Sequence, residues 1–189
     1  MPVGLASRLA MRLGTAAAPR LSGTDRLEKN LAVVGVPDPR DAARRGIGFY
    51  ARYWVDTFRL PQVGRQVVDR RFGFVGYHHI LDVQAAGATP IMVLPHLGSW
   101  EWAAAWLGLV DGQKVVAVVE DLEPEEVFEW FRETRESYGV KVVPLGPNSF
   151  RTLMSEVKMR DSIICLLADR DISGSGVEVT LFGRATTLP

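Results

Sequence analysis

The sequence has almost no cysteine, no excess of either charge and no long apolar run. Its single cysteine, Cys165, excludes an internal disulfide and a cysteine-based zinc site. Basic and acidic residues number 22 each, so the basic excess typical of nucleic-acid-binding proteins is missing. No stretch reaches the roughly 20 apolar residues that a membrane-spanning helix needs. These absences favour an intracellular globular protein that does not bind nucleic acid.

The composition nevertheless supplies enough apolar material for a packed core. Of 189 residues, 47% are hydrophobic and 23% are charged, which is typical of one globular domain. At the N-terminus, Arg8 and Arg12 interrupt any apolar stretch long enough for a secretory signal. Segment 5–13 is both apolar and cationic. It predicts either an amphipathic helix on an anionic membrane surface, or a helix that packs on the protein or frays.

Helices are predicted before residue 88. Residues 41–60 carry aromatic side chains at spacings of three to four, and this spacing predicts a helix whose aromatic stripe faces a core. The stripe consists of Phe49, Tyr53, Trp54 and Phe58. A further helix is predicted over residues 79–86. His78 and His79 begin this region, and we interpret them as surface or packing residues.

After residue 88, short apolar runs alternate with helical patterns. The runs are residues 90–95, 115–119, 140–145 and 162–168. Runs that are apolar on both faces and alternate with helices are typical of a parallel sheet covered by helices. We therefore predict an α/β fold with a largely parallel sheet and N-terminal helices. Residues 1–87 would form the N-terminal helical segment, and residues 88–189 the α/β core.

Polar, titratable residues follow three of these runs. They are His96 after the first, Glu120 after the second, and Asp169 with Arg170 after the last. Because the carboxyl ends of parallel strands meet at one edge of a sheet, these side chains are predicted to face one crevice. A histidine with carboxylates is the makeup of a general acid–base site, with His96 at its centre. The alternative for His96 is a loop histidine that bonds the following helix.

Other candidates have simpler explanations. Glu101 lies five residues after His96 and cannot meet it as a helix neighbour, whereas the helix dipole favours a carboxylate in a first turn. Ser99 fits a helix N-cap, and the missing G-x-S-x-G elbow disfavours a hydrolase. Cys165 lies in an apolar run and is predicted to be an inert core thiol. Arg135 fits either a surface salt bridge or a cationic site for a phosphate-bearing substrate.

Several segments resemble one known family. The sequence from His96 to Glu101 resembles the H-x4-D/E motif of the bacterial lipid A biosynthesis acyltransferases. Segments 51–61, 93–107, 118–139 and 165–183 are similar to the actinobacterial branch that acylates phosphatidylinositol mannosides. The resemblance runs from about residue 26 to residue 189. It also implies that the family fold continues past this chain, so that a C-terminal part of the fold is missing.

The resemblance implies a chemistry. A long fatty acyl group, typically palmitoyl, would pass from acyl-CoA to a mannose hydroxyl of a phosphatidylinositol mannoside, with no metal and no cofactor other than the acyl-CoA substrate. His96 would be the general base, Asp169 its carboxylate partner and Glu101 the carboxylate of the motif. The protein would work as a peripheral enzyme on the cytoplasmic face of the plasma membrane.

The same resemblance assigns substrate-binding roles to three further residues. They are Glu120, Arg135 and Arg170. Two alternatives stay open at this point: a non-catalytic fragment that binds membrane lipid, and an acyltransferase that acts on another glycolipid acceptor.

Overall fold

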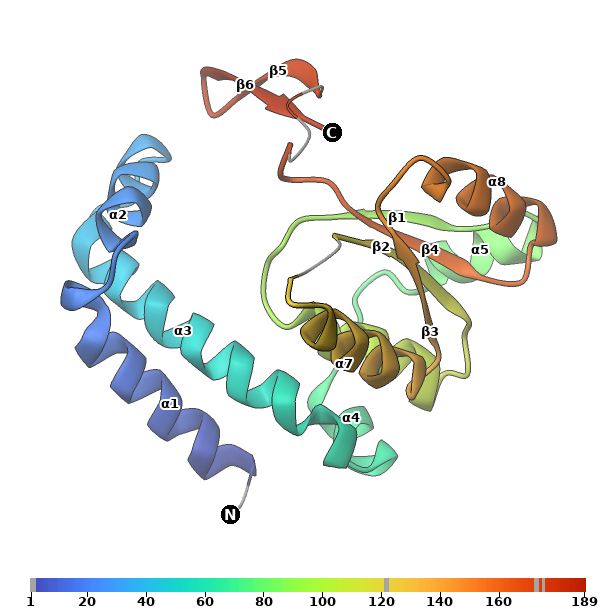
Figure 1. The fold of residues 1–189 in the computed structure, drawn as a ribbon, viewed down its shortest axis with the longest axis horizontal. Coiled ribbons are helices and arrows are strands. Elements are labelled where there is room, and N and C mark those ends of the chain that lie inside the picture. Colours follow the sequence, from blue (N-terminus) through green and yellow to red (C-terminus); the bar gives the residue numbers. More distant parts are fainter. Residues whose placement is uncertain (1–2, 121–122, 172–173, 175) are drawn as a thin grey trace. The chain divides into compact units, whose positions relative to one another are not determined.

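A computed structural model of the chain describes residues 3–120, 123–171, 174 and 176–189 (Figure 1). The chain divides into two compact units. One comprises residues 1–60 and 178–186, and the other residues 61–177 and 187–189. The segment 61–87, which the sequence placed with the N-terminal helices, belongs to the second unit together with the sheet.

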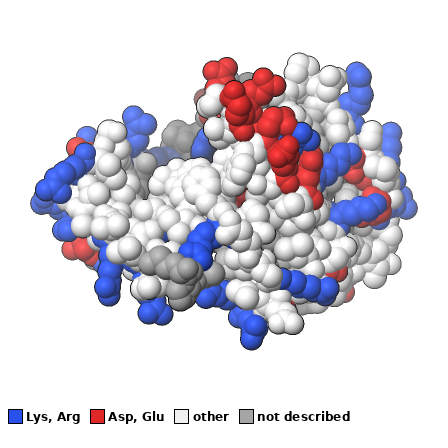
Figure 2. Space-filling model, turned by 60° about the horizontal axis from the view of Figure 1, so that its bottom comes forward, with Lys and Arg blue, Asp and Glu red and all other residues white. Residues whose placement is uncertain are grey.

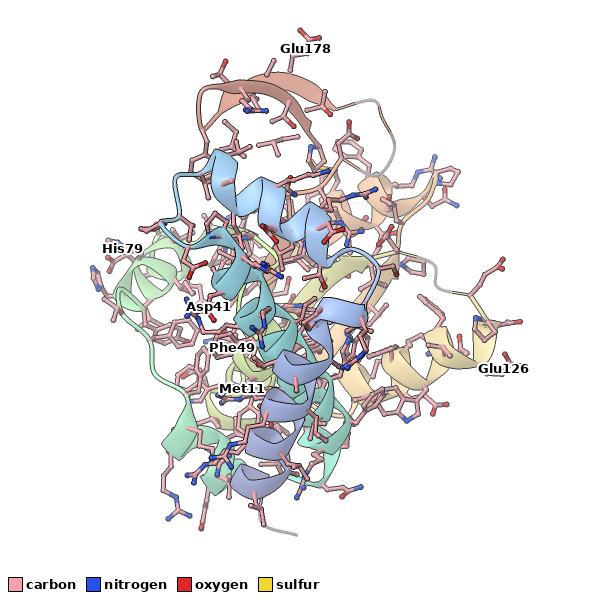
Figure 3. All side chains as sticks on the ribbon, turned by 90° about the vertical axis from the view of Figure 1, so that its left-hand side faces the viewer. Met11, Asp41, Phe49, His79, Glu126 and Glu178 are labelled. Atoms are coloured by element: carbon pink, nitrogen blue, oxygen red, sulfur yellow. The ribbon has the colours of Figure 1, made fainter. Side chains whose placement is uncertain are left out.

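The first unit is built mainly from helices. They are α1 (Val3–Ala17), the 3-10 turn η1 (Ala18–Arg20), α2 (Thr24–Val33) and α3 (Pro39–Arg59). Helix α1 lies along α3 (Figures 1 and 3). Small residues allow this close approach: a Cβ atom at Gly48 would lie 2.7 Å from the backbone oxygen of Met11, and one at Gly14 would lie 2.7 Å from the Cβ of Ala51. Any larger side chain at these glycines would push the helices apart.

The aromatic stripe of α3 does not face a core, so that prediction was wrong. Phe49 and Phe58 are exposed, and Tyr53 and Trp54 are only half-buried. The buried positions of α3 are instead small or polar: Ala43, Gly48, Asp56 and Thr57. Asp56 tolerates burial because Ser7 of α1 and Arg52 donate hydrogen bonds to its carboxylate. Phe49 and Phe58 therefore turn outward, and Trp54 stacks on Phe58.

The second unit contains a four-stranded parallel sheet, which confirms the α/β class. The strands are β1 (Ile91–Leu94), β2 (Val115–Val119), β3 (Val140–Pro144) and β4 (Ile163–Leu167), in the order β1-β4-β2-β3. The turns and helices before the sheet are η2 (Leu60–Gln62), α4 (Arg65–Arg71) and α5 (His78–Ala85). Those between the strands are α6 (Trp100–Ala105), the π-helical turn η3 (Trp106–Val110), α7 (Glu125–Glu136) and α8 (Ser149–Met159).

Helices α7 and α8 cover opposite faces of this sheet (Figure 1). In the strand order β1-β4-β2-β3, the connection from β2 to β3 runs toward one edge of the sheet, and the connection from β3 to β4 runs in the opposite direction. Because both crossovers are right-handed, their helices lie on opposite faces. The core beneath them includes Val115, Val116, Ile163 and Ile164, which are almost fully buried. This explains why the middle strands are apolar on both faces.

The remaining strands, β5 (Val177–Leu181) and β6 (Arg184–Leu188), form a separate two-stranded sheet. Phe182 and Gly183 turn the chain between them, both with positive φ. Within the part of the chain that the structure describes, no helix is long and apolar enough to cross a membrane.

Candidate active site

The sheet brings His96 and Asp169 together. Strands β1 and β4 are hydrogen-bonded neighbours, with Leu94 opposite Leu167 at their last paired position. His96 and Asp169 each follow two residues later. Because the strands are parallel and in this register, the two residues leave the sheet side by side at its carboxyl edge.

Asp169 makes two contacts with His96. Its Oδ1 lies 2.6 Å from His96 Nδ1, and its Oδ2 accepts a hydrogen bond of 2.9 Å from the His96 backbone N–H. With Nδ1–H donating to the carboxylate, Nε2 is the nitrogen that can accept a proton. Both side chains are about one third exposed, at 33% and 36%, so a substrate can reach them.

The charge state of Asp169 reflects this contact. Partial burial alone would raise the pKa of the Asp169 carboxyl, but the hydrogen bonds from His96 outweigh it and hold the pKa below its usual range. Asp169 is therefore an anion at neutral pH.

A tight turn links His96 to the next helix. Gly98 adopts a φ of +67°, and the Leu97 N–H donates to the Pro95 carbonyl at 2.7 Å. Ser99 occupies the N-cap position of α6, as the sequence predicted, but its hydroxyl makes no capping hydrogen bond. At the start of α6, the backbone N–H of Trp102 instead donates a hydrogen bond to the Ser99 carbonyl.

Glu101 lies in the first turn of α6 and is fully buried in the protein interior. Its carboxylate accepts hydrogen bonds from Arg135 Nη2 at 2.7 Å and from Tyr138 Oη at 2.6 Å. Arg135 lies in α7, 34 residues away. The helix dipole therefore does not by itself explain Glu101, because the residue forms an ion pair that joins α6 to α7.

Arg135 is enclosed by the same arrangement. Its side chain is 9% exposed, and its guanidinium lies 4.9 Å from the ring centroid of Trp100 and 5.1 Å from that of Phe131. It forms neither the surface salt bridge nor the open phosphate site that the sequence left as alternatives. The neighbouring Arg132 makes the surface ion pairs, with Glu129 and Glu136. The guanidinium therefore links α7 to α6, and the substrate-binding role that the resemblance assigns to Arg135 stays a prediction.

The second exposed pair at the carboxyl edge is Glu120 with Arg170. Arg170 Nη2 donates to Glu120 Oε2 at 3.1 Å. Strands β2 and β4 are neighbours, which explains why the residues that follow them meet. Ion pairs this exposed are weak, so either partner can exchange its contact for a polar ligand at little cost.

Sequence reasoning missed the apolar side chains at this edge. Leu97 follows His96, Leu145 follows β3, and Phe150 lies in the first turn of α8, and all three are exposed. Their signal in the sequence is an apolar residue at or just past a strand end, where polar residues are usual. Cys165 behaves as predicted, since burial within β4 raises the pKa of its thiol to about 12 and leaves it inert.

The fold and the site together define a class of protein. A histidine bonded to a carboxylate at the carboxyl edge of a parallel α/β sheet combines the group types that acid–base chemistry uses, and the buried thiol of Cys165 is unsuited to act as a nucleophile. The whole chain, residues 1–189, matches the sequence profile of the bacterial lipid A biosynthesis acyltransferases, and the protein belongs to this family.

Curated relatives carry a more specific description. The chain is 37% identical over 182 residues to a phosphatidylinositol mannoside acyltransferase of Mycolicibacterium smegmatis, and that match covers 93% of the chain. It is 36% identical over 194 residues to the phosphatidylinositol mannoside acyltransferase of Mycobacterium tuberculosis, with 97% of the chain covered. The chain spans 60% of the length of each of these relatives.

Proposed function

We propose that the protein transfers a long-chain, palmitoyl-like acyl group from acyl-CoA to a mannose hydroxyl of a phosphatidylinositol mannoside. The observation that carries the proposal is the contact between His96 Nδ1 and Asp169, which leaves Nε2 as the proton acceptor. Family membership supports acyl transfer, and the names of the relatives support the acceptor.

In the proposed reaction, His96 Nε2 takes the proton from the acceptor hydroxyl as its oxygen attacks the thioester carbonyl. The tetrahedral intermediate collapses to an ester, and the carbon–sulfur bond breaks. The leaving CoA thiolate takes the proton back from His96. Asp169 stabilises the imidazolium between these two proton transfers. Acyl-CoA is a substrate here, and the sequence of steps needs no metal and no further cofactor.

The other site residues take supporting roles in this proposal. Arg170 and Glu120, exposed beside the pair, would contact the polar part of a substrate. Glu101 and Arg135 would hold α6, and with it the His96 turn, against α7. The exposed side chains of Leu97, Leu145 and Phe150 are apolar and would contact the acyl chain.

We also propose that the protein works as a peripheral protein at the cytoplasmic face of the plasma membrane. Helix α1 carries Leu5, Leu9 and Leu13 one turn apart, exposed at 54%, 47% and 61%, next to the exposed Arg8 and Arg12. An apolar row flanked by cations fits a membrane with anionic lipids. The net charge of the chain is zero, but the charges are unevenly distributed: Asp and Glu are densest in one area of the visible face, and Lys and Arg lie over much of the rest (Figure 2).

The test is CoA release from palmitoyl-CoA in the presence of a phosphatidylinositol mannoside acceptor. We expect turnover that His96→Ala lowers about 10²–10⁴-fold, since a positioned general base contributes that much. His96 lies in an exposed turn, so the variant should fold normally, which circular dichroism checks. Near-normal turnover in the folded variant would exclude this mechanism.

A second candidate function is lipid binding without turnover. The exposed apolar row of α1, which includes Leu5, Leu9 and Leu13, fits this function as well. Vesicle binding by the wild-type chain without any CoA release would support it. CoA release with another glycolipid, but not with the mannoside, would instead show a different acceptor.

A further inference from the structure

His78, His79 and Asp82 place three metal-ligating groups together on α5, away from the acid–base site. One potential ligand atom from each residue lies within 4.8 Å of the others. The two imidazole rings are 4.0 Å apart between centroids. Among the described residues, no other group of three histidine, cysteine or acidic side chains converges in this way.

The helix explains the convergence. Asp82 follows His78 by four residues and His79 by three, and residues at these two spacings are neighbours on a helix surface. The side chains are exposed, and His79 projects from the outer side of α5 (Figure 3). The ring of His79 also lies over Gly76, where a Cβ atom would lie 3.3 Å from its Cδ2.

The backbone that carries these groups is held in place on both sides. Before the helix, the Tyr77 hydroxyl donates a hydrogen bond to Asp111. Within the last turn, Gln84 Nε2 donates to Gln113 Oε1 at 2.9 Å. Two fixed points about two turns apart restrict rotation of the helix. The three ligands are thus presented together without relying on a cation to order the segment.

We propose that His78, His79 and Asp82 form a binding site for a divalent cation of the zinc type. Two imidazoles and one carboxylate are donors that Zn²⁺, Co²⁺ and Ni²⁺ accept well. Tetrahedral coordination at zinc bond lengths brings ligand atoms to about 3.4 Å from one another. Exposed side chains reach this spacing from the observed one by small rotations. Three protein ligands leave one tetrahedral position to water or to an outside ligand.

This site does not belong to the proposed reaction. Tyr77 and Gln84 contact Asp111 and Gln113, which precede β2 and therefore lie toward the amino ends of the parallel strands. His96 lies at the opposite, carboxyl edge. Cation binding at α5 and proton transfer at His96 can consequently be tested separately.

The experiment is a calorimetric titration of the metal-free full chain with Zn²⁺, repeated with Co²⁺ to record its visible absorption. We expect one equivalent of Zn²⁺ to bind, and a Co²⁺ spectrum typical of four- or five-coordination. His79→Ala and Asp82→Asn should each weaken Zn²⁺ binding at least about tenfold. Both side chains are exposed, so neither change should unfold the protein.

The matched control is His96→Ala, which removes the only other histidine of the chain. It should bind Zn²⁺ like the wild type. The proposal is overturned if the wild type shows no saturable 1:1 binding, if a His78→Ala/His79→Ala double variant binds unchanged, or if His96→Ala abolishes binding. The last result would assign the metal to His96 and Asp169.

Discussion

The carboxylates of Asp169 and Glu101 have different surroundings, although the sequence offers both as partners of His96. Asp169 is partly exposed and bonds His96 through both oxygens, whereas Glu101 is buried and bonds Arg135 and Tyr138. We therefore expect a change at Asp169 to affect catalysis and a change at Glu101 to affect the stability of the fold. Asp169 bonds the ring and the backbone of His96, and Glu101 compensates the buried charge of Arg135.

This contrast gives a prediction for the two isosteric amides. Asp169→Asn should lower kcat by about 10²–10⁴-fold and change the free energy of unfolding little, because it removes the anion that stabilises protonated His96. Glu101→Gln should lower the free energy of unfolding by about 3 kcal/mol, because it leaves the buried Arg135 without its anion. CoA-release kinetics and urea unfolding of both variants measure the two effects.

The matched control for these amides is Glu126→Gln, which changes an exposed carboxylate at the start of α7 (Figure 3). It should alter neither kcat nor stability. If Glu101→Gln lost more activity than Asp169→Asn at equal stability, Glu101 would be the residue that acts with His96.

The pH dependence of stability is a second prediction at this scale. Hydrogen bonds from His96 hold the pKa of Asp169 below its ordinary value of 3.8. A carboxylate with a depressed pKa in the folded state stabilises the fold at neutral pH, and this contribution is lost as the pH falls through the folded-state pKa. Solvent screening keeps the effect small, since the side chain is 36% exposed.

The difference in Tm between wild type and Asp169→Asn should therefore be present at about pH 7 and shrink below about pH 4. Thermal unfolding followed by circular dichroism across this range measures it. A difference that grew with acidity would mean that Asp169 is protonated more easily in the folded protein than in the unfolded chain.

Helix α1 shows at the scale of elements how one sequence pattern can serve two purposes. Its glycine face packs closely on α3 through Gly14, while Leu5, Leu9 and Leu13 stay exposed. The two interpretations of segment 5–13 were thus not exclusive, because a helix has more than one face. Packing on α3 is observed, and membrane contact remains a proposal.

We expect the triple variant Leu5→Gln/Leu9→Gln/Leu13→Gln to bind anionic vesicles at least about tenfold more weakly, because it removes the apolar row that would enter the lipid surface. High salt should also weaken binding by the wild type, through screening of Arg8 and Arg12. Co-sedimentation with vesicles measures both effects. The matched control is Leu81→Gln, which changes an exposed leucine of α5.

Unchanged co-sedimentation of the folded triple variant would show that the α1 leucines are not the anchor. The exposed apolar side chains at the carboxyl edge of the sheet would then be the better candidates.

For the whole molecule, the local patterns predicted most elements well. All four strands of the parallel sheet, and the helices expected over residues 41–60 and 79–86, form within a few residues of the expected bounds. The grouping of the residues that follow the strands could be predicted because the carboxyl ends of parallel strands lie at the same edge of a sheet. The aromatic stripe of α3 was misjudged because its spacing marks a common helix face but does not say whether that face is covered.

By itself, the sequence determined the class of the fold, the order of its elements and the residues at the carboxyl edge, because periodicity and strand ends are local properties of the chain. Only the tertiary structure decided the partner of Glu101 and the outward direction of Phe49 and Phe58. Those features depend on which face of a helix another element covers. Arg135 is 34 residues from Glu101, and only the packing of α6 against α7 brings them into contact.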